Sequence, residues 1–216
     1  MTKLYKNYKH IIFDFDGTVN DTSEGIYATF TAVLKHFGID ASGVDLSEHI
    51  GPPLKYSYTK LLGEKYCDEA IALHGKYFAE LNAVALSKPY DGAIEMLQKV
   101  KSCGKYTVSV ASCKFEPHLI ASLKTFGIDK YFDYVYAQNE TRQFKSDVLK
   151  ALIDENGFDR KECLMIGDTL NDVDGAAENG IDVVAVTYGF GKKEELARSP
   201  AIALCASPAE VTQLLV

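Results

Sequence analysis

The 216-residue chain has the length of one domain, or of one core domain with a smaller insert, and its 47% hydrophobic content is enough for a buried core. Its 23 Lys and Arg against 30 Asp and Glu give a net charge of −7, which argues against a basic nucleic-acid surface or a polybasic membrane anchor. The five cysteines are scattered without a CxxC pair, so neither a disulfide scaffold nor a zinc cluster is expected.

The first apolar run of the chain, Ile11–Phe13, is interrupted at once by Asp14, which is too early for a signal peptide. No apolar run approaches the ~18 residues of a membrane span. We therefore expect a cytoplasmic protein with reduced thiols, a small-molecule partner, and no nucleic-acid or membrane partner. The sequence leaves monomer and homodimer open.

Short, apolar, β-branched runs alternate with helical patterns along most of the chain, which predicts an α/β fold with a parallel sheet. The predicted strands are His10–Phe15, Tyr106–Ala111, Tyr134–Ala137, Leu164–Ile166 and Val183–Val186. The predicted helices are Gly92–Ser102, Pro117–Phe126, Ser146–Asn156 and Asn171–Asn179. Residues 1–21 and 89–216 thus form a Rossmann-like core.

Residues 22–88 break this alternation, because they contain helical patterns and no convincing strand. An apolar stripe of Tyr27, Phe30, Leu34 and Phe37 opens the segment, and a second stripe of Leu73, Tyr77 and Leu81 follows later. Core packing explains these aromatic residues better than a cofactor site. We expect a separate helical domain inserted after the first strand, with Gly51–Pro53 as a turn between its helices.

The first strand ends in the sequence Asp14-Phe15-Asp16-Gly17-Thr18. Side chains alternate along an extended strand, so Asp14 and Asp16 project to one side while Phe15 enters the core. Gly17 permits a sharp turn, and Thr18 can form a local hydrogen bond. Ligands of open parallel sheets bind at the carboxyl ends of the strands, where these two carboxylates lie.

Other strand ends supply further polar groups to the same edge. They are Ser112, Cys113 and Lys114 after the second strand, Lys145 after the third, and Asp168 and Asp172 after the fourth. Four buried carboxylates would repel one another unless a divalent cation neutralised them, and oxygen-only ligands favour Mg²⁺ over zinc. The aspartates carry −4 and the two lysines +2, so a bound Mg²⁺ brings the site near zero and permits a phosphate to enter.

These motifs, in this order and spacing, resemble those of the haloacid dehalogenase superfamily, and the insert resembles the C1-type helical cap of its phosphoglycolate phosphatase-like branch. The resemblance implies that Asp14 is the nucleophile, which becomes an aspartyl-phosphate, and that Asp16 is the acid and base. It implies that Ser112 holds a phosphoryl oxygen and that Lys145 offsets negative charge. Asp14, the backbone carbonyl of Asp16, and Asp168 would bind Mg²⁺, with Asp172 as a ligand or as the partner of one.

Substrate recognition is less defined by the sequence. The candidate phosphate- or substrate-binding residues are Gly17, Thr18, Asn20, Pro52, Tyr56, Cys113 and Lys114. Cys113 stands where relatives commonly carry a small polar residue that can contact the phosphate or the substrate. Phosphoglycolate, a nucleoside monophosphate, pyrophosphate or a sugar phosphate all fit, and a Tyr-rich insert mildly favours a substrate with a ring.

The favoured activity is a Mg²⁺-dependent phosphatase acting on a small phosphorylated metabolite. One alternative is a phosphomutase of the β-phosphoglucomutase kind, although no clear basic clamp for a second phosphate marks residues 22–88. Another is a non-catalytic phosphate-binding module, which has no need for the acid Asp16. A cysteine phosphatase is excluded because no cysteine is followed by Arg six positions later, and no P-loop is present.

Overall fold

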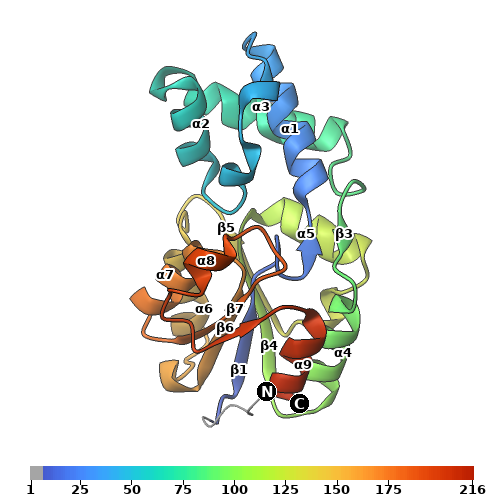
Figure 1. Cartoon of the computed structure of the whole chain (residues 1–216), viewed down its shortest axis with the longest axis vertical. Helices are drawn as coiled ribbons and strands as arrows, with labels where there is room; N and C mark the ends of the chain where they lie inside the picture. Colours follow the sequence, from blue (N-terminus) through green and yellow to red (C-terminus); the bar gives the residue numbers. More distant parts are fainter. Residues whose placement is uncertain (1–6) are drawn as a thin grey trace. The chain divides into compact units, whose positions relative to one another are not determined.

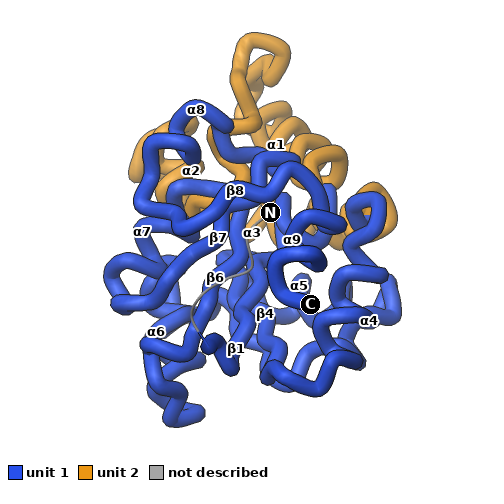
Figure 2. The backbone as a smooth tube through the Cα atoms, turned by 60° about the horizontal axis from the view of Figure 1, so that its bottom comes forward, with its two compact units in different colours: residues 1–21, 89–216 blue, residues 22–88 orange. Residues whose placement is uncertain are grey.

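A computed structural model of the chain describes residues 7–216. The chain divides into two compact units (Figure 2). One comprises the N-terminal segment up to Asp21 together with Pro89–Val216, and the other is Thr22–Lys88, the range in which the sequence predicts a helical insert. Within residues 7–216, no helix is long and apolar enough to cross a lipid bilayer.

The larger unit is built on a parallel sheet in the order β5-β4-β1-β6-β7-β8. The strands are β1 (His10–Phe13), β4 (Thr107–Phe115), β5 (Tyr134–Gln138), β6 (Cys163–Gly167), β7 (Asp182–Val186) and β8 (Ala203–Cys205). The predicted α/β class with a parallel sheet is confirmed. Two differences concern length: β1 ends two residues before the predicted end, at Phe13, and β4 runs four residues beyond Ala111.

Helices cover both faces of this sheet and bury its β-branched side chains (Figure 1). One face packs against α4 (Ala93–Ser102), α5 (Glu116–Thr125) and α9 (Pro208–Leu215). The other packs against α6 (Lys145–Glu155), α7 (Leu170–Glu178) and the short α8 (Lys193–Leu196). β1 lies in the middle of the sheet, between β4 and β6, and both of its faces are covered. Because successive side chains of a strand point to opposite faces, Ile11 packs in one core and Ile12 in the other.

Several short elements were not predicted from the sequence. β8 and α9 at the C-terminal end of the chain were not predicted, because three strand residues and eight helical residues carry too little periodicity. Two further strands of two residues each, β2 (Asn20–Asp21) and β3 (Lys88–Pro89), form a separate small sheet.

The smaller unit contains three α-helices, α1 (Ser23–His36), α2 (Leu54–Leu62) and α3 (Cys67–Glu80), with short 3-10 turns at Ala41–Gly43, Leu46–His49 and Glu64–Tyr66. Phe30 and Leu34 of the first predicted stripe are buried, with Phe30 against Tyr58 in the core of the unit. The role of the smaller unit as a cap remains a prediction.

The second predicted stripe, Leu73, Tyr77 and Leu81, is correct only in part. Leu73 and Tyr77 are partly buried and pack against the core of the unit, but the buried face of α3 is a neighbouring one. That face carries Cys67, Ala70, His74 and Phe78, and Leu81 lies beyond the end of the helix with 41% of its surface exposed. The physical reason is a buried hydrogen bond of 2.7 Å between the Tyr58 hydroxyl and His74 Nδ1, which gives this ring nitrogen a partner and lets a histidine occupy a core position.

Candidate active site

Asp14 directly follows β1, a central strand of the sheet, and its side chain is buried. Its backbone N–H donates to the carbonyl of Ile166 at 2.8 Å, so the residue stays attached to β6 beyond the end of β1. Asp14 is 6% exposed, and its Oδ1 accepts a 2.7 Å hydrogen bond from the Phe15 N–H. Phe15 is fully buried in the core, which fixes the direction of the nucleophile candidate beside it.

The turn after Asp16 depends on Gly17. Gly17 has a φ of +85°, and its N–H donates to the carbonyl of Asn20 at 2.8 Å, which closes the turn. A Cβ at this position would lie 2.1 Å from Asp168 Oδ2. The turn therefore needs glycine both for its conformation and for its close approach to Asp168.

Lys145 connects three parts of the sheet edge. Its Nζ lies 2.8 Å from Asp14 Oδ1 and 2.8 Å from Asp172 Oδ1, and it donates to the carbonyl of Ala111 at 2.9 Å. Burial alone would lower the pKa of Lys145, but Asp14 and Asp172 raise it above its ordinary value. The ammonium group therefore stays charged in a position where it can neutralise Asp14.

Asp172 links the start of α7 to the strand end before it. Its Oδ2 accepts hydrogen bonds from the N–H groups of Asp168 and Thr169 and from Thr169 Oγ1, at 2.9 to 3.1 Å. A carboxylate in the first turn of a helix is favourably placed to accept such bonds. Because Oδ2 is engaged in this way and Oδ1 faces Lys145, Asp172 orients both Asp168 and Lys145.

Asp14, Asp168 and Asp172 form a buried acidic cluster, with one carboxylate oxygen of each lying within 4.8 Å of the others. Burial raises the pKa of Asp14 to about 7 even though Lys145 opposes the shift. Burial, followed by the charges of Asp172 and Asp14, raises the pKa of Asp168 well above its ordinary value. The single positive charge of Lys145 thus does not neutralise the three carboxylates. The buried carboxylate oxygens of the cluster are donors that fit a divalent cation such as Mg²⁺.

A loop that follows β7 holds Asp168 in place, and none of its residues is among the site candidates named from the sequence. Asp168 Oδ2 accepts from the Phe190 N–H at 2.8 Å, and Asp168 Oδ1 accepts from Thr18 Oγ1 at 3.1 Å. A Cβ at Gly189 would lie 2.4 Å from Asp168 Oδ2, and one at Gly191 would lie 1.9 Å from the Asp168 carbonyl oxygen. The two glycines allow this close approach.

Tyr188 and Gly175 also support the site, although sequence reasoning did not select them. The hydroxyl of the half-buried Tyr188 donates to the Thr18 carbonyl at 2.8 Å. A Cβ at Gly175 of α7 would lie 2.7 Å from Lys145 Cγ, so this glycine makes room for the lysine stem. The aromatic residue at a strand end and the helical glycine were the available signals, but neither identifies its partner in the sequence.

The end of β4 brings Ser112 and Lys114 to the same edge. Ser112 is 1% exposed, and its Oγ accepts from the Lys114 N–H at 3.1 Å. Lys114 Nζ lies 3.1 Å from Asp16 Oδ1, so the Asp16 carboxylate pairs with this lysine and is not part of the acidic cluster. Burial raises the pKa of the Cys113 thiol to about 12, which makes it a poor nucleophile.

The remaining substrate candidates lie in different settings. Asn20 is fully buried, and neither Oδ1 nor Nδ2 of its amide has a hydrogen-bond partner among residues 7–216. Pro52 is half-buried and precedes α2, whereas Tyr56 of α2 is 57% exposed. Pro52 and Tyr56 belong to the smaller unit, and their part in substrate binding stays a prediction.

Residues 11–186 match the family of haloacid dehalogenase-like hydrolases. The chain belongs to this family. It is 32% identical over 213 residues to a 5'-nucleotidase of Pseudomonas aeruginosa, with 96% of each chain covered. It is also 33% identical to the tyrosine-protein kinase PtkA of Mycobacterium tuberculosis, over 85% of this chain and 64% of the relative.

The solved structures agree with this assignment. A predicted phosphatase from Clostridium acetobutylicum has a TM-score of 0.90 and 30% identity, with 95% of this chain and 97% of the other covered. The resemblance inferred from the sequence motifs is confirmed at the level of family and fold.

Proposed function

We propose that the protein is a Mg²⁺-dependent phosphatase that hydrolyses a small phosphate monoester through an aspartyl-phosphate on Asp14. The observation that carries the proposal is the Lys145 ammonium, 2.8 Å from both Asp14 and Asp172 in a buried acidic cluster. Membership of a hydrolase family and a relative named as a 5'-nucleotidase support the phosphatase class.

In the first half-reaction an Asp14 carboxylate oxygen attacks phosphorus while the bond from phosphorus to the ester oxygen breaks, and Asp16 gives its proton to that oxygen. In the second, water attacks the same phosphorus, the bond to Asp14 breaks, and Asp16 takes the proton of the water. Ser112 would hold a phosphoryl oxygen, and Lys145, whose Nζ lies 2.8 Å from Asp14, would offset the charge that Asp14 shares with the phosphoryl group.

Asp14 and Asp168 are the side chains that would hold the cation, together with the backbone carbonyl of Asp16, and Asp172 would ligate it or orient Asp168. Bound Mg²⁺ would supply charge neutralisation for the phosphoryl group and raise the electrophilicity of phosphorus. Thr18 and the Phe190 N–H each occupy one oxygen of Asp168, and this fixes the plane of its carboxylate.

The test is phosphate release from phosphoglycolate, nucleoside monophosphates, pyrophosphate and sugar phosphates, with Mg²⁺ and again with EDTA. We expect release from one substrate class that EDTA abolishes. Asp14→Asn should abolish turnover with the fold intact, and Asp16→Asn should slow both half-reactions. A folded Asp14→Asn protein with a near-normal rate contradicts the mechanism. Conversion of β-glucose 1-phosphate to the 6-phosphate would instead identify a mutase.

A further inference from the structure

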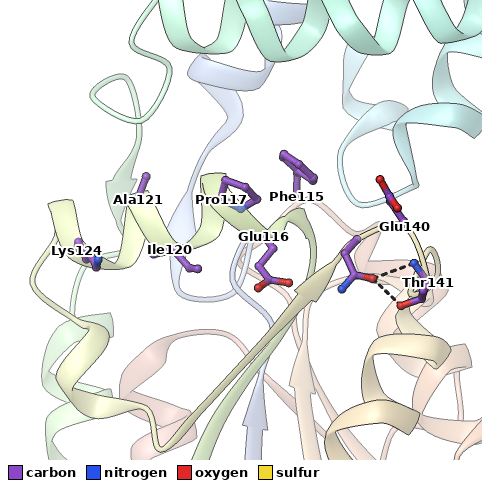
Figure 3. A pocket seen from close by; sticks show the side chains of 9 residues that line it. Phe115, Glu116, Pro117, Ile120, Ala121, Lys124, Glu140 and Thr141 are labelled. Carbon is purple, nitrogen blue, oxygen red and sulfur yellow. Dashed lines mark hydrogen bonds between the residues drawn. The ribbon is translucent and has the colours of Figure 1, made fainter.

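The larger unit carries an open groove of about 880 Å³ whose lining begins at Phe115, the residue after Lys114 (Figure 3). One wall is formed by Phe115, the last residue of β4, and by Pro117 and Ile120 of α5, and the other is the loop after β5, where Glu140 and Thr141 lie. The volume is in the range of small-molecule sites in proteins.

The wall formed by the end of β4 and by α5 exposes apolar side chains that do not pack in the core. Phe115 is 47% exposed and Ile120 of α5 is 38% exposed, whereas Leu119 and Leu123 of α5 are buried. An aromatic ring left half in solvent beside a groove offers a flat surface on which another ring can stack. The wall is therefore suited to a planar group rather than to a flexible or charged one.

One residue that lines the groove, Phe115, is close in sequence to residues proposed to act on the phosphate ester. Phe115 directly follows Lys114, whose Nζ lies 3.1 Å from Asp16, and comes three residues after Ser112 on β4. Three extended residues span at most about 10 Å. A substrate with its phosphoryl group at Ser112 and its ester oxygen at Asp16 can therefore reach Phe115 with a sugar and one ring.

The charges of the groove indicate what kind of group fits there. Its lining contains the carboxylates of Glu116 and Glu140 against one ammonium group, that of Lys124. Arg142 pairs with Glu116 at 3.1 Å, and its guanidinium also lies over the ring of Tyr136. A second phosphate on the substrate would meet carboxylates in this groove, whereas an uncharged ring with N–H or O–H donors would find acceptors.

We propose that this groove is a subsite for the uncharged, ring-bearing leaving group of the substrate, of which a nucleoside is the representative, and that Phe115 stacks on the ring. The inference rests on the proposed function for the position of the phosphoryl group, and it adds a substrate class to it. It makes a bisphosphate an unfavourable ligand and places a determinant of specificity on the core unit itself.

The experiment compares two ligands that share a phosphate and a ribose and differ in the ring: adenosine 5'-monophosphate and ribose 5-phosphate. Their dissociation constants are measured by calorimetry on the full chain carrying Asp14→Asn, which prevents turnover. Stacking contributes about 1–3 kcal/mol per base, so we expect Phe115→Ala to weaken the nucleotide at least about fivefold. Its effect on ribose 5-phosphate should be less than twofold.

Phe115→Tyr should restore nucleotide affinity, because it keeps the ring. Ile94→Ala is the matched control, since Ile94 is a 39% exposed apolar residue of α4 outside the groove. The inference is overturned if Phe115→Ala weakens both ligands equally or neither. Because this comparison measures binding, it stands apart from turnover: absence of phosphate release by the wild type contradicts the proposed function, and an unchanged affinity ratio contradicts the subsite.

Discussion

Replacing Asp14 by asparagine should make the metal-free protein more stable while it removes activity. Asp14 is buried, and its pKa is raised from the ordinary value of 3.8 to about 7, chiefly by burial, with Lys145 opposing the shift and Asp172 adding to it. Asparagine is uncharged and keeps an oxygen that can accept the bonds from Phe15 and Lys145. It therefore imitates the protonated acid, the form that the buried site tolerates best.

The magnitude follows from linkage between protonation and folding. A carboxyl group with a raised folded pKa contributes full stability below its unfolded pKa, and this contribution is lost as the pH rises towards the folded pKa. The interval from 3.8 to about 7 corresponds to about 4 kcal/mol. Asp14→Asn should thus raise the free energy of unfolding by up to about 4 kcal/mol at pH 8, and by less than about 1 kcal/mol at pH 4.

Urea denaturation in EDTA at pH 8 and at pH 4 measures both values, with Asp174→Asn as a control because Asp174 is an exposed aspartate of α7. Added Mg²⁺ should stabilise the wild type and leave the Asp14→Asn protein almost unchanged. A variant that is equally or less stable than the wild type at pH 8 in EDTA would refute this account of the electrostatics of the cluster.

Three further substitutions test the surroundings of the site and the fold. Gly191→Ala places a Cβ 1.9 Å from the Asp168 carbonyl oxygen, so we expect a loss of about 1–3 kcal/mol in urea denaturation and weaker Mg²⁺ binding in calorimetry. Tyr188→Phe leaves the Thr18 carbonyl without its donor and should cost about 1–3 kcal/mol, whereas unchanged stability would argue against that bond. At Asp133, burial raises the pKa, but the bonds from Lys101 and the Val108 N–H outweigh it and lower the pKa overall. Its contribution is therefore present above the unfolded pKa and lost as pH falls, so Asp133→Asn should destabilise the protein at pH 7 and have less effect near pH 3.

Much of the fold was predictable because its signal is local. Fully buried parallel strands read as short apolar runs, and the runs at Leu164–Ile166 and Val183–Val186 are the centres of β6 and β7. The face of α3 was not predictable, because the preference of His74 for the core depends on Tyr58, sixteen residues away. Pattern reasoning assigns a histidine to the surface unless its partner is known.

The candidate site divides in the same way. Asp14, Lys145 and Asp168 follow strands, so topology alone brings them to one edge of the sheet. The packing of Gly189 and Gly191 against Asp168 depends on interatomic distances that no spacing rule provides. The groove beside Phe115 likewise depends on which face of α5 the core leaves exposed.

The central claim is that phosphoryl transfer passes through Asp14, and the most direct test is to isolate the covalent intermediate. The protein is mixed with a ³²P-labelled substrate and Mg²⁺, quenched in acid within one turnover, and digested, with Asp16→Asn used to slow the hydrolytic half-reaction. The account predicts hydroxylamine-sensitive label on the peptide containing Asp14, and none in the Asp14→Asn protein. Rapid release of phosphate with no label on the protein at any time, or label on another residue, would contradict it.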